Sequence, residues 1–419
     1  MKEKNRTMRW AWLPFLCLAL SGCSGSELLE EIPRDIVAVP TEMSVSEPTV
    51  TEMEEISSSS SEEMPEEERD FFLWEGADDY AYSCLSEAEQ IWYHDIEKIL
   101  GSHLEEQQLS EEGLTKGLDE TSIDRVFQCV LNDHPELFYV EGYSYTKFTR
   151  NDVISSIEFS GTYNVNLETA REKEAQIQTA AERILSGISE NASDYDKVKY
   201  VYDTLIRETD YQLDSADNQN IYSVFVNHAS VCQGYAKATQ YLLNRLGVEC
   251  TLVLGNVDTG EGHAWNLVKV NGSYYYVDTT WGDASYQMED ASAAQPAMPE
   301  INYDYLNVTT EELLRTHTIG GCVPMPACVA TEENYYVKEG ALFESYDTEQ
   351  MSALFAGAFA QGKEDVTVKC TDMTCYNEVM QALIEEQEIF KYLGNAGNSI
   401  AYAQNDKQLS LTFWVTNGE

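Results

Sequence analysis

The chain has 419 residues, of which 73 are acidic and 26 are basic, and its formal net charge is −47. This excess of acid argues against nucleic-acid binding, because that function needs Lys and Arg to displace counterions from phosphate. With 43% hydrophobic and 11% aromatic residues, the composition is that of a folded protein, and the length allows two or three domains.

The N-terminus has the features of an export signal. Four basic residues within the first nine precede an apolar run over 10–20, which is too short to span a membrane as a mature helix. The Leu-Ser-Gly-Cys sequence at 20–23 resembles the lipobox of bacterial lipoproteins. The resemblance implies a signal peptide over 1–22, lipidation of Cys23, and anchoring on the extracytoplasmic face of a bacterial cell membrane. A plain signal peptide or an uncleaved anchor is the alternative.

The next segment, 23–70, is rich in Glu and Ser and has no aromatic residue. Such a composition buries too little apolar surface to fold, so we expect a disordered acidic spacer that holds the folded part away from the membrane. A binding tail for a cationic partner is the alternative.

The region 71–190 is expected to be mainly helical with a few strands. Apolar residues recur at helical spacing between 79 and 137, and a Tyr-rich stretch over 138–165 alternates in part, as strands do. Helices are then expected over 167–185 and, at the start of the next domain, over 194–208.

The chemistry is expected between 230 and 283. Apolar residues repeat at three and four after Cys232, and Gly247 suits a C-terminal cap, so a helix is predicted over 232–246. Cys232 then lies in the first turn, where the helix dipole and free backbone N–H groups favour a thiolate and can stabilise an oxyanion.

A hairpin is predicted after this helix. Strands are expected over 250–256, from His263 onward, and over 273–280, with Asn271 and Gly272 as a two-residue turn. This turn places Trp265 opposite Asp278 and His263 opposite Thr280, so His263 and Asp278 become diagonal neighbours on one face, about 7–8 Å apart between backbones.

A thiol, an imidazole and a carboxylate in this order suit nucleophilic acyl transfer. The imidazole takes the thiol proton, and the carboxylate orients the imidazole. Taken singly, each residue has an ordinary structural interpretation as a core cysteine, a surface histidine or a turn aspartate. Their joint geometry favours catalysis.

Three blocks around these residues resemble the transglutaminase-like superfamily, in its bacterial, protease-like branch. They are Cys232 with Gly234 and Tyr235, the run His263-Ala264-Trp265-Asn266, and the run Tyr276-Val277-Asp278-Thr279-Thr280-Trp281. The resemblance implies an α+β fold with a papain-like core, in which the nucleophile helix packs on an antiparallel sheet over 191–329. It also implies Cys232 as nucleophile, His263 as base and Asp278 as orienting acid.

Substrate and oxyanion contacts are expected from residues near these blocks. The second oxyanion donor of the family lies upstream of the cysteine, where Gln219, Asn220 and Tyr222 are the candidates. Gly234, Tyr235, Trp265 and Trp281 are further candidates for contacts with substrate. No cofactor is expected, and no calcium loop is present in the sequence.

Seven cysteines remain after those in the signal, the lipidation site and the nucleophile position. Pairs Cys322–Cys328 and Cys370–Cys375 can close small loops under oxidation, while buried thiols are the default for the rest. A zinc site at His317, Cys322 and Cys328 fits no common spacing and lacks a fourth ligand.

A small α+β domain is expected over 330–419. The pattern predicts a hairpin over 335–343, helices over 351–361 and 376–389, and strands over 366–370, 399–404 and 409–415. The region contains no His and no catalytic motif.

The sequence thus favours a lipid-anchored thiol acyltransferase or amidase that acts on a peptide or protein substrate through a thioester, with hydrolysis slightly preferred over crosslinking. The acidic charge hints at cationic substrates. An inactive surface module of the same fold that binds peptide or cell-wall polymer is the rival hypothesis, and a plain structural protein is the third. Oligomeric state is not indicated.

Overall fold

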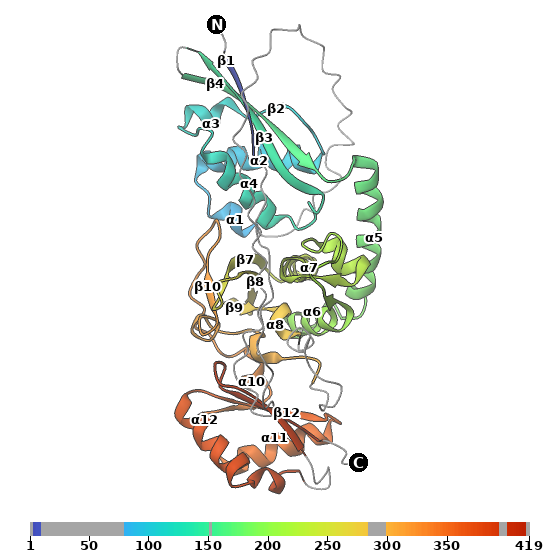
Figure 1. The fold of residues 1–419 in the computed structure, drawn as a ribbon, viewed down its shortest axis with the longest axis vertical. Helices are drawn as coiled ribbons and strands as arrows, with labels where there is room; N and C mark the ends of the chain where they lie inside the picture. Colours follow the sequence, from blue (N-terminus) through green and yellow to red (C-terminus); the bar gives the residue numbers. More distant parts are fainter. Residues whose placement is uncertain (1–2, 10–78, 151–152, 284–298, 394–399, 416–419) are drawn as a thin grey trace, which may run out of the picture.

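The computed structural model describes residues 3–9, 79–150, 153–283, 299–393 and 400–415. Three units are stacked along the long axis, each built on its own four-stranded sheet (Figure 1). The expected α+β class is confirmed. Cys23 and the spacer lie outside the described residues.

The first unit pairs short helices with a sheet of order β1-β3-β4-β2. Its helices are α1 (Tyr80–Ser83), α2 (Glu87–Gly101), α3 (Glu111–Thr115) and α4 (Ser122–Asp133), and its strands are β2 (Gln107–Gln108), β3 (Val140–Arg150) and β4 (Val153–Tyr163). Strand β1 (Glu3–Arg9), from the segment expected to be the signal peptide, pairs antiparallel with β3. The predicted apolar stripes are buried, from Trp92 on α2 to Val130 on α4.

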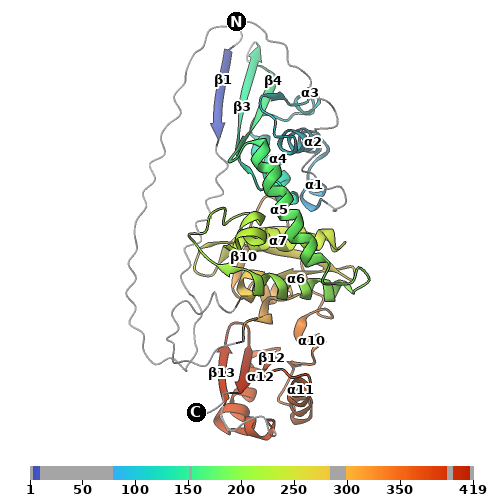
Figure 2. The ribbon, with the colours of Figure 1, turned by 90° about the vertical axis from the view of Figure 1, so that its right-hand side faces the viewer.

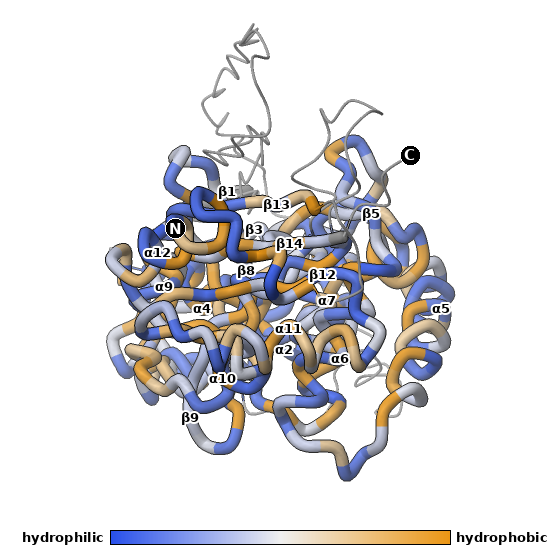
Figure 3. The backbone as a smooth tube through the Cα atoms, turned by 90° about the horizontal axis from the view of Figure 1, so that it is seen from below, coloured by the Kyte–Doolittle hydropathy of each residue, from blue (hydrophilic) through white to orange (hydrophobic). Residues whose placement is uncertain are grey.

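Helix α5 (Leu167–Leu185) joins the first unit to the second and has the predicted bounds. It runs alongside both units (Figure 2), and in the view along the long axis its hydrophilic and hydrophobic stretches alternate at the edge of the molecule (Figure 3). This alternation reflects one buried stripe that includes Ile177 and Ile184.

The second unit holds α6, α7 and a sheet of order β10-β7-β8-β9. Its elements are α6 (Asp194–Glu208), β5 (Asp210–Tyr211), the π-helix η2 (Ser223–Asn227), β6 (Ala229–Ser230), α7 (Cys232–Arg245), β7 (Cys250–Val257), β8 (Gly262–Val270), β9 (Ser273–Val277), α8 (Thr279–Gly282), η4 (Tyr303–Tyr305), α9 (Thr310–Leu313) and β10 (His317–Ile319). One apolar cluster extends from Ala81 in the first unit through this second unit to Ala341.

The predicted hairpin register is confirmed where the strands pair. Val270 lies opposite Ser273 and Asn266 opposite Val277, across a turn in which Asn271 and Gly272 both have positive φ. The prediction of a strand to Thr280 is wrong, because β9 ends at Val277 and α8 follows. The side chain of Asp278 caps α8 by accepting a hydrogen bond from Trp281 N, which turns the chain out of the sheet before the expected last pairs can form.

The third unit has its own apolar cluster, which extends from Phe343 to Phe413. Its elements are α10 (Tyr335–Lys338), β11 (Leu342–Phe343), α11 (Thr348–Ala360), β12 (Asp365–Cys370), α12 (Met373–Met380), the π-helix η5 (Gln381–Glu385), η6 (Glu388–Lys391), β13 (Ile400–Asn405) and β14 (Ser410–Val415). The sheet order is β11-β12-β14-β13.

Two predictions in the third unit are wrong. The expected hairpin over 335–343 is a helical turn followed by β11, which pairs in parallel with β12, because Asn334 caps the turn by accepting from Tyr336 N. The expected helix over 376–389 begins earlier and breaks into α12, η5 and η6, with Gln387 in a left-handed conformation at the break.

All eight cysteines of the described residues are free thiols, including the pairs Cys322–Cys328 and Cys370–Cys375 that oxidation could close. Within the part of the chain that the structure describes, no helix combines the length and apolarity needed to cross a bilayer.

Candidate active site

Cys232 is the first residue of α7, a 14-residue helix. Its side chain is 1% exposed and belongs to a buried cluster with Ala264, the residue that follows His263 on β8. Helix α7 packs on β7 and β8. The predicted helix start therefore brings the thiol to the sheet that carries the imidazole.

Close backbone packing fixes the start of α7. Val231 N donates to Asn218 O, and Ser230 Oγ donates to the same carbonyl at 2.7 Å. A Cβ atom on Gly234 would lie 2.0 Å from Ser230 Oγ and 3.0 Å from Asn218 O. Only glycine lets the first turn pack against the segment 218–220.

His263 and Asp278 form the expected contact. Nε2 of His263 lies 2.7 Å from Oδ2 of Asp278, and both side chains are buried. The contact depends on the cap of α8 as well as on the hairpin, because Asp278 lies one residue beyond the end of β9.

A third residue, His317, completes the cluster. Its Nε2 lies 3.1 Å from the same Oδ2 of Asp278, and its side chain has no exposed surface. The zinc hypothesis for His317 is not supported, because among the described residues its ring is grouped with His263 and Asp278 and not with Cys322 and Cys328. No local sequence signal marks this residue, since it starts a three-residue strand 39 positions after Asp278.

The charges of this cluster follow from its contacts. Burial alone would raise the pKa of Asp278, but hydrogen bonds and charge interactions with His263 and His317 hold it well below its ordinary value. Burial lowers the pKa of His317, and the attraction of Asp278 opposes that shift only in part. The structure therefore favours an ionised carboxylate beside a neutral His317.

Aromatic rings enclose the two imidazoles. Trp265 stacks on His263 with centroids 5.8 Å apart, and Trp281 lies 6.0 Å from His263 and 4.8 Å from His317. These two expected site residues are thus brought to the cluster. The rings exclude water, which strengthens the hydrogen bonds to Asp278.

The other expected site residues are held in different places. Tyr222 donates to Gln176 Oε1 on α5, and buried Tyr235 donates to Thr209 O at 2.6 Å. Asn220 donates to Phe138 O. Gln219 belongs to the segment 218–220 that packs against the start of α7.

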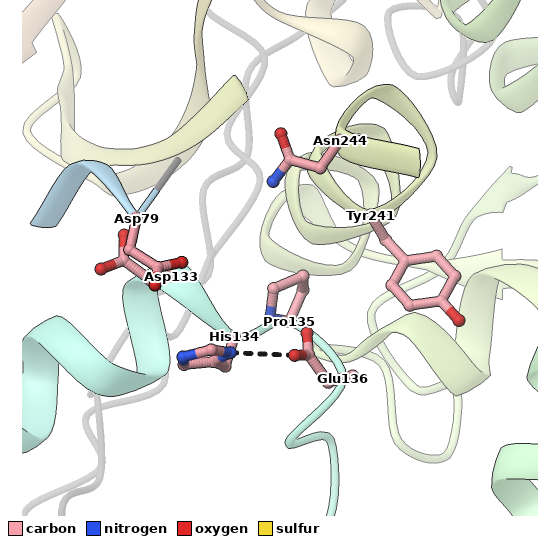
Figure 4. Close-up of a pocket in the computed structure, with 7 residues that line it drawn as sticks. All are labelled: Asp79, Asp133, His134, Pro135, Glu136, Tyr241 and Asn244. Atoms are coloured by element: carbon pink, nitrogen blue, oxygen red, sulfur yellow. Dashed lines mark hydrogen bonds and ion pairs between the residues drawn. The ribbon is translucent and has the colours of Figure 1, made fainter. Parts of the chain in front are cut away.

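A second cluster of histidine and carboxylates lies in the first unit. Nδ1 of His134 is 2.9 Å from Glu136 Oε1, and its Nε2 is 3.0 Å from Glu97 Oε1. Figure 4 shows His134 beside Glu136, with the carboxylates of Asp79 and Asp133 close together near the ring. These residues line a cavity of about 20 Å³.

His134 is a cation in this setting. Burial alone would lower its pKa, but Glu136 and Glu97 raise it well above the ordinary value. Burial raises the pKa of Asp133 to about 7, although backbone N–H groups of Ala81 and Tyr82 oppose this shift. Among the described residues, ligand atoms close enough to share a metal ion occur in two groups, His263–Asp278–His317 and Asp79–Glu97–His134.

Comparisons with known proteins support the resemblance seen in the sequence. Residues 178–279 match the family model of the transglutaminase-like superfamily. The kyphoscoliosis peptidase of Mus musculus is 23% identical in an alignment of 130 residues that covers 27% of this chain and 20% of that protein. The chain thus spans about a fifth of the length of this curated relative.

Two solved structures are similar to part of this chain. The crystal structure of a TGase is 18% identical, with a TM-score of 0.24, over 39% of this chain and 55% of that chain. The periplasmic domain of TgpA from Pseudomonas aeruginosa is 13% identical, with a TM-score of 0.23, over 36% of this chain and 76% of that chain. The transglutaminase-like resemblance of the central segment is therefore confirmed by its family match.

Proposed function

We propose that this protein is a lipid-anchored, extracytoplasmic thiol acyltransferase or amidase, in which Cys232 attacks an amide or peptide carbonyl. The observation that carries the proposal is the buried His263–Asp278 pair, with 2.7 Å between Nε2 and Oδ2, because His263 lies on β8, the strand against which the Cys232 helix packs.

His263 is the proton acceptor in this mechanism. Ionised Asp278 only accepts hydrogen bonds, so Nε2 of His263 carries the proton that it donates to Oδ2. Nδ1 is then the nitrogen that takes the thiol proton from Cys232. The imidazolium that results is stabilised by Asp278, as acyl transfer requires.

The helix start supplies the second part of the chemistry. The backbone N–H groups of the first turn of α7 and the positive end of its dipole favour the thiolate of Cys232. The same N–H groups can donate hydrogen bonds to the carbonyl oxygen as negative charge develops on it. Of the three candidates for the second donor, Gln219, Asn220 and Tyr222, the last two have side chains that bind Phe138 O and Gln176 on other elements.

The reaction then proceeds in two steps, formation of a thioester and its breakdown. The thiolate sulfur bonds to the carbonyl carbon, and His263 returns the proton to the amine as the C–N bond breaks, which leaves a thioester. Water or an amine next attacks the thioester carbon, His263 takes the proton of this nucleophile, and the proton passes to the thiolate as the C–S bond breaks. A peptide or protein is the proposed substrate, with cationic character favoured by the net charge of −47.

One observation favours the rival function. Cys232 is only 1% exposed, as expected of a surface module that keeps the fold to bind peptide or cell-wall polymer without catalysis. The two functions differ in the reactivity of the thiol, because a binding module needs no thiolate at neutral pH.

The rate of alkylation of Cys232 distinguishes the two functions. The full chain, purified from membranes in detergent, is treated with iodoacetamide between pH 5 and 10, and the peptide that contains Cys232 is quantified by mass spectrometry. The proposal expects fast alkylation well below pH 8.5, the ordinary pKa of a thiol, and loss of this low-pH reactivity in His263→Ala. Reaction like an ordinary thiol, with no effect of His263→Ala, would favour the binding module.

The anchor is tested separately. Growth with a labelled fatty acid is expected to label the wild-type protein and not Cys23→Ala, which lacks the thiol that the lipobox presents. Equal labelling of both proteins would contradict lipidation at Cys23.

A further inference from the structure

His317 plays no part in the proposed mechanism, yet its side chain is as fully buried as that of Asp278. Its side chain has no exposed surface, and it contacts the carboxylate that orients the base, Nε2 to Asp278 Oδ2 at 3.1 Å. Its other nitrogen, Nδ1, lies 2.8 Å from Oγ1 of Thr316. Both ring nitrogens are therefore engaged by defined partners.

These contacts assign the tautomer of His317. Asp278 is ionised and accepts only, so Nε2 of His317 carries a proton and donates it. Burial lowers the pKa of the His317 ring more than Asp278 and a backbone hydrogen bond at Leu313 raise it, which favours the neutral ring, and Nδ1 then accepts from the hydroxyl of Thr316. Asp278 receives three hydrogen bonds in total, from His263, His317 and Trp281 N.

Packing fixes the ring of His317 in this position. The rings of Trp265, Trp281 and Tyr305 have centroids within 5.7 Å of it. Strand β10 reaches the sheet closely at Gly255, where a Cβ atom would lie 2.1 Å from Thr318 O and 2.6 Å from a ring carbon of Trp265.

A chain of hydrogen bonds leads from His317 into the third unit. The hydroxyls of Thr316 and Tyr305 are 3.4 Å apart, and Gln408 Nε2 lies 3.4 Å from Tyr305 Oη and 3.2 Å from Glu312 O. Gln408 precedes β14 and has no exposed surface. It also faces the buried ion pair of Lys369 with Asp304, the residue before Tyr305.

We infer that His317 is a positioning residue for the Asp278–His263 pair, and that the third unit holds it in place through Gln408, Tyr305 and Thr316. By donating to Asp278, His317 fixes the carboxylate rotamer and keeps it ionised, so that it orients His263 without taking its proton. The inference rests on the proposed function, and it gives the third unit a role in the site.

The test uses the rate constant for alkylation of Cys232 in the full chain, at pH 6 and at pH 10. His317→Leu is expected to lower the rate about tenfold at pH 6, the lower end of effects seen when a group that orients a functional ligand is removed. At pH 10 the thiol ionises without help, so the two rates are expected to agree within about twofold. His317→Gln keeps an N–H donor near the position of Nε2 and is expected to recover most of the loss.

Two further pairs of variants test the chain of hydrogen bonds. Thr316→Val is expected to lower the pH 6 rate about threefold, while Thr316→Ser keeps the hydroxyl and the rate. Gln408→Leu is expected to act in the same direction, and Gln361→Leu, on the exposed end of α11, is its matched control. The Thr316 pair keeps the inference testable if His317→Leu fails to fold.

The outcomes are distinct. If His263→Ala removes the pH 6 reactivity but His317→Leu and Thr316→Val leave it unchanged, the proposed function stands and the positioning role is overturned. Equal losses at pH 6 and pH 10 in His317→Leu also overturn it, because they show a general structural effect. If wild type already reacts like an ordinary thiol, the proposed function fails and the inference fails with it.

¹⁵N NMR of the histidine rings gives a readout that does not depend on reactivity. His317 is expected to be neutral and protonated on Nε2 at pH 7. An Nδ1–H tautomer, or a charged ring, would overturn the assignment even if Cys232 is reactive.

Discussion

The two clusters of histidine and carboxylate differ in the ratio of imidazoles to carboxylates. In the central unit, one carboxylate oxygen of Asp278 contacts two imidazoles, those of His263 and His317. In the first unit, one imidazole, His134, contacts two carboxylates, Glu97 and Glu136.

This difference decides which group carries charge. Two imidazoles around one carboxylate keep the carboxylate ionised, and the pKa of His317 is lowered. Two carboxylates around one imidazole raise the pKa of His134 and make it a fixed cation. A base must be able to gain a proton, so only the first arrangement suits catalysis. The second is a structural ion-pair cluster.

The largest expected effect is on stability, in His134→Leu. Removing the cation leaves the buried Glu136 and the partly buried Glu97 without their shared partner, which is expected to cost about 3 kcal/mol of unfolding free energy. Urea unfolding measures the loss, and His94→Leu is the comparison, because it removes a contact with the same Glu97 from a side chain that is 61% exposed and is therefore expected to cost less. Alkylation of Cys232 at pH 6 should stay as in wild type. A loss of that reactivity in His134→Leu would contradict the assignment of catalysis to the central cluster alone.

The second prediction concerns the central cluster, in His263→Ala. An ordinary thiol with a pKa of about 8.5 is roughly 0.3% ionised at pH 6, so loss of the base is expected to slow alkylation about a hundredfold there. The rate at pH 10 should change little. A similar loss in His134→Leu, or none in His263→Ala, would contradict the assignment of the base.

The third prediction addresses the packing that brings Cys232 to the sheet. Gly234→Ala places a Cβ atom 2.0 Å from Ser230 Oγ, so we expect a loss of about 2 kcal/mol in unfolding free energy. Gly357→Ala is the matched control, because a Cβ there meets nothing within 4 Å in helix α11, and a gain of about 0.5–1 kcal/mol is expected. Equal effects of the two changes would show that the start of α7 is not tightly packed.

The smallest expected effect is the pH dependence of stability, which has opposite signs in the two clusters. The folded pKa of His134 is raised, so its contribution is present below about pH 6.5 and is lost as pH rises through the folded value. The pKa of His317 is lowered, so its contribution is present above about pH 6.5 and is lost as pH falls. The contribution of Asp278 is likewise present above about pH 4 and lost in acid.

Melting temperatures between pH 4 and 10 check these signs. His134→Leu is expected to flatten the alkaline side of the profile, and His317→Leu is expected to flatten the side below about pH 6.5. The opposite pattern would mean that the charge states of the two clusters are reversed.

Much of the site was predictable because its determinants are local. The helix from Cys232 follows from apolar spacing and a C-terminal glycine, and the register of β8 on β9 follows from the turn at Asn271 and Gly272. The contact of His263 with Asp278 was expected for these reasons. The end of β9 at Val277 was not expected, because the cap of α8 competes with the last strand pairs.

The third unit shows why local patterns fail. The stretch around Tyr335 has the aromatic content of a strand, but Asn334 caps it as a helical turn, and the strand that follows pairs in parallel with a distant partner. Parallel pairing between distant segments leaves no hairpin signal in the sequence.

Short-range periodicity and turn chemistry were enough to predict the nucleophile helix and the hairpin that brings His263 toward Asp278, and the three sequence blocks carried the resemblance to transglutaminase-like proteins. Only the tertiary structure placed His317 against Asp278, separated its cluster from that of His134, and joined Gln408 to the site. The contact of His317 with Asp278 joins residues 39 positions apart, and that of Gln408 with Tyr305 joins residues 103 positions apart. The charge states of the two clusters depend on burial and on partners that no local pattern encodes.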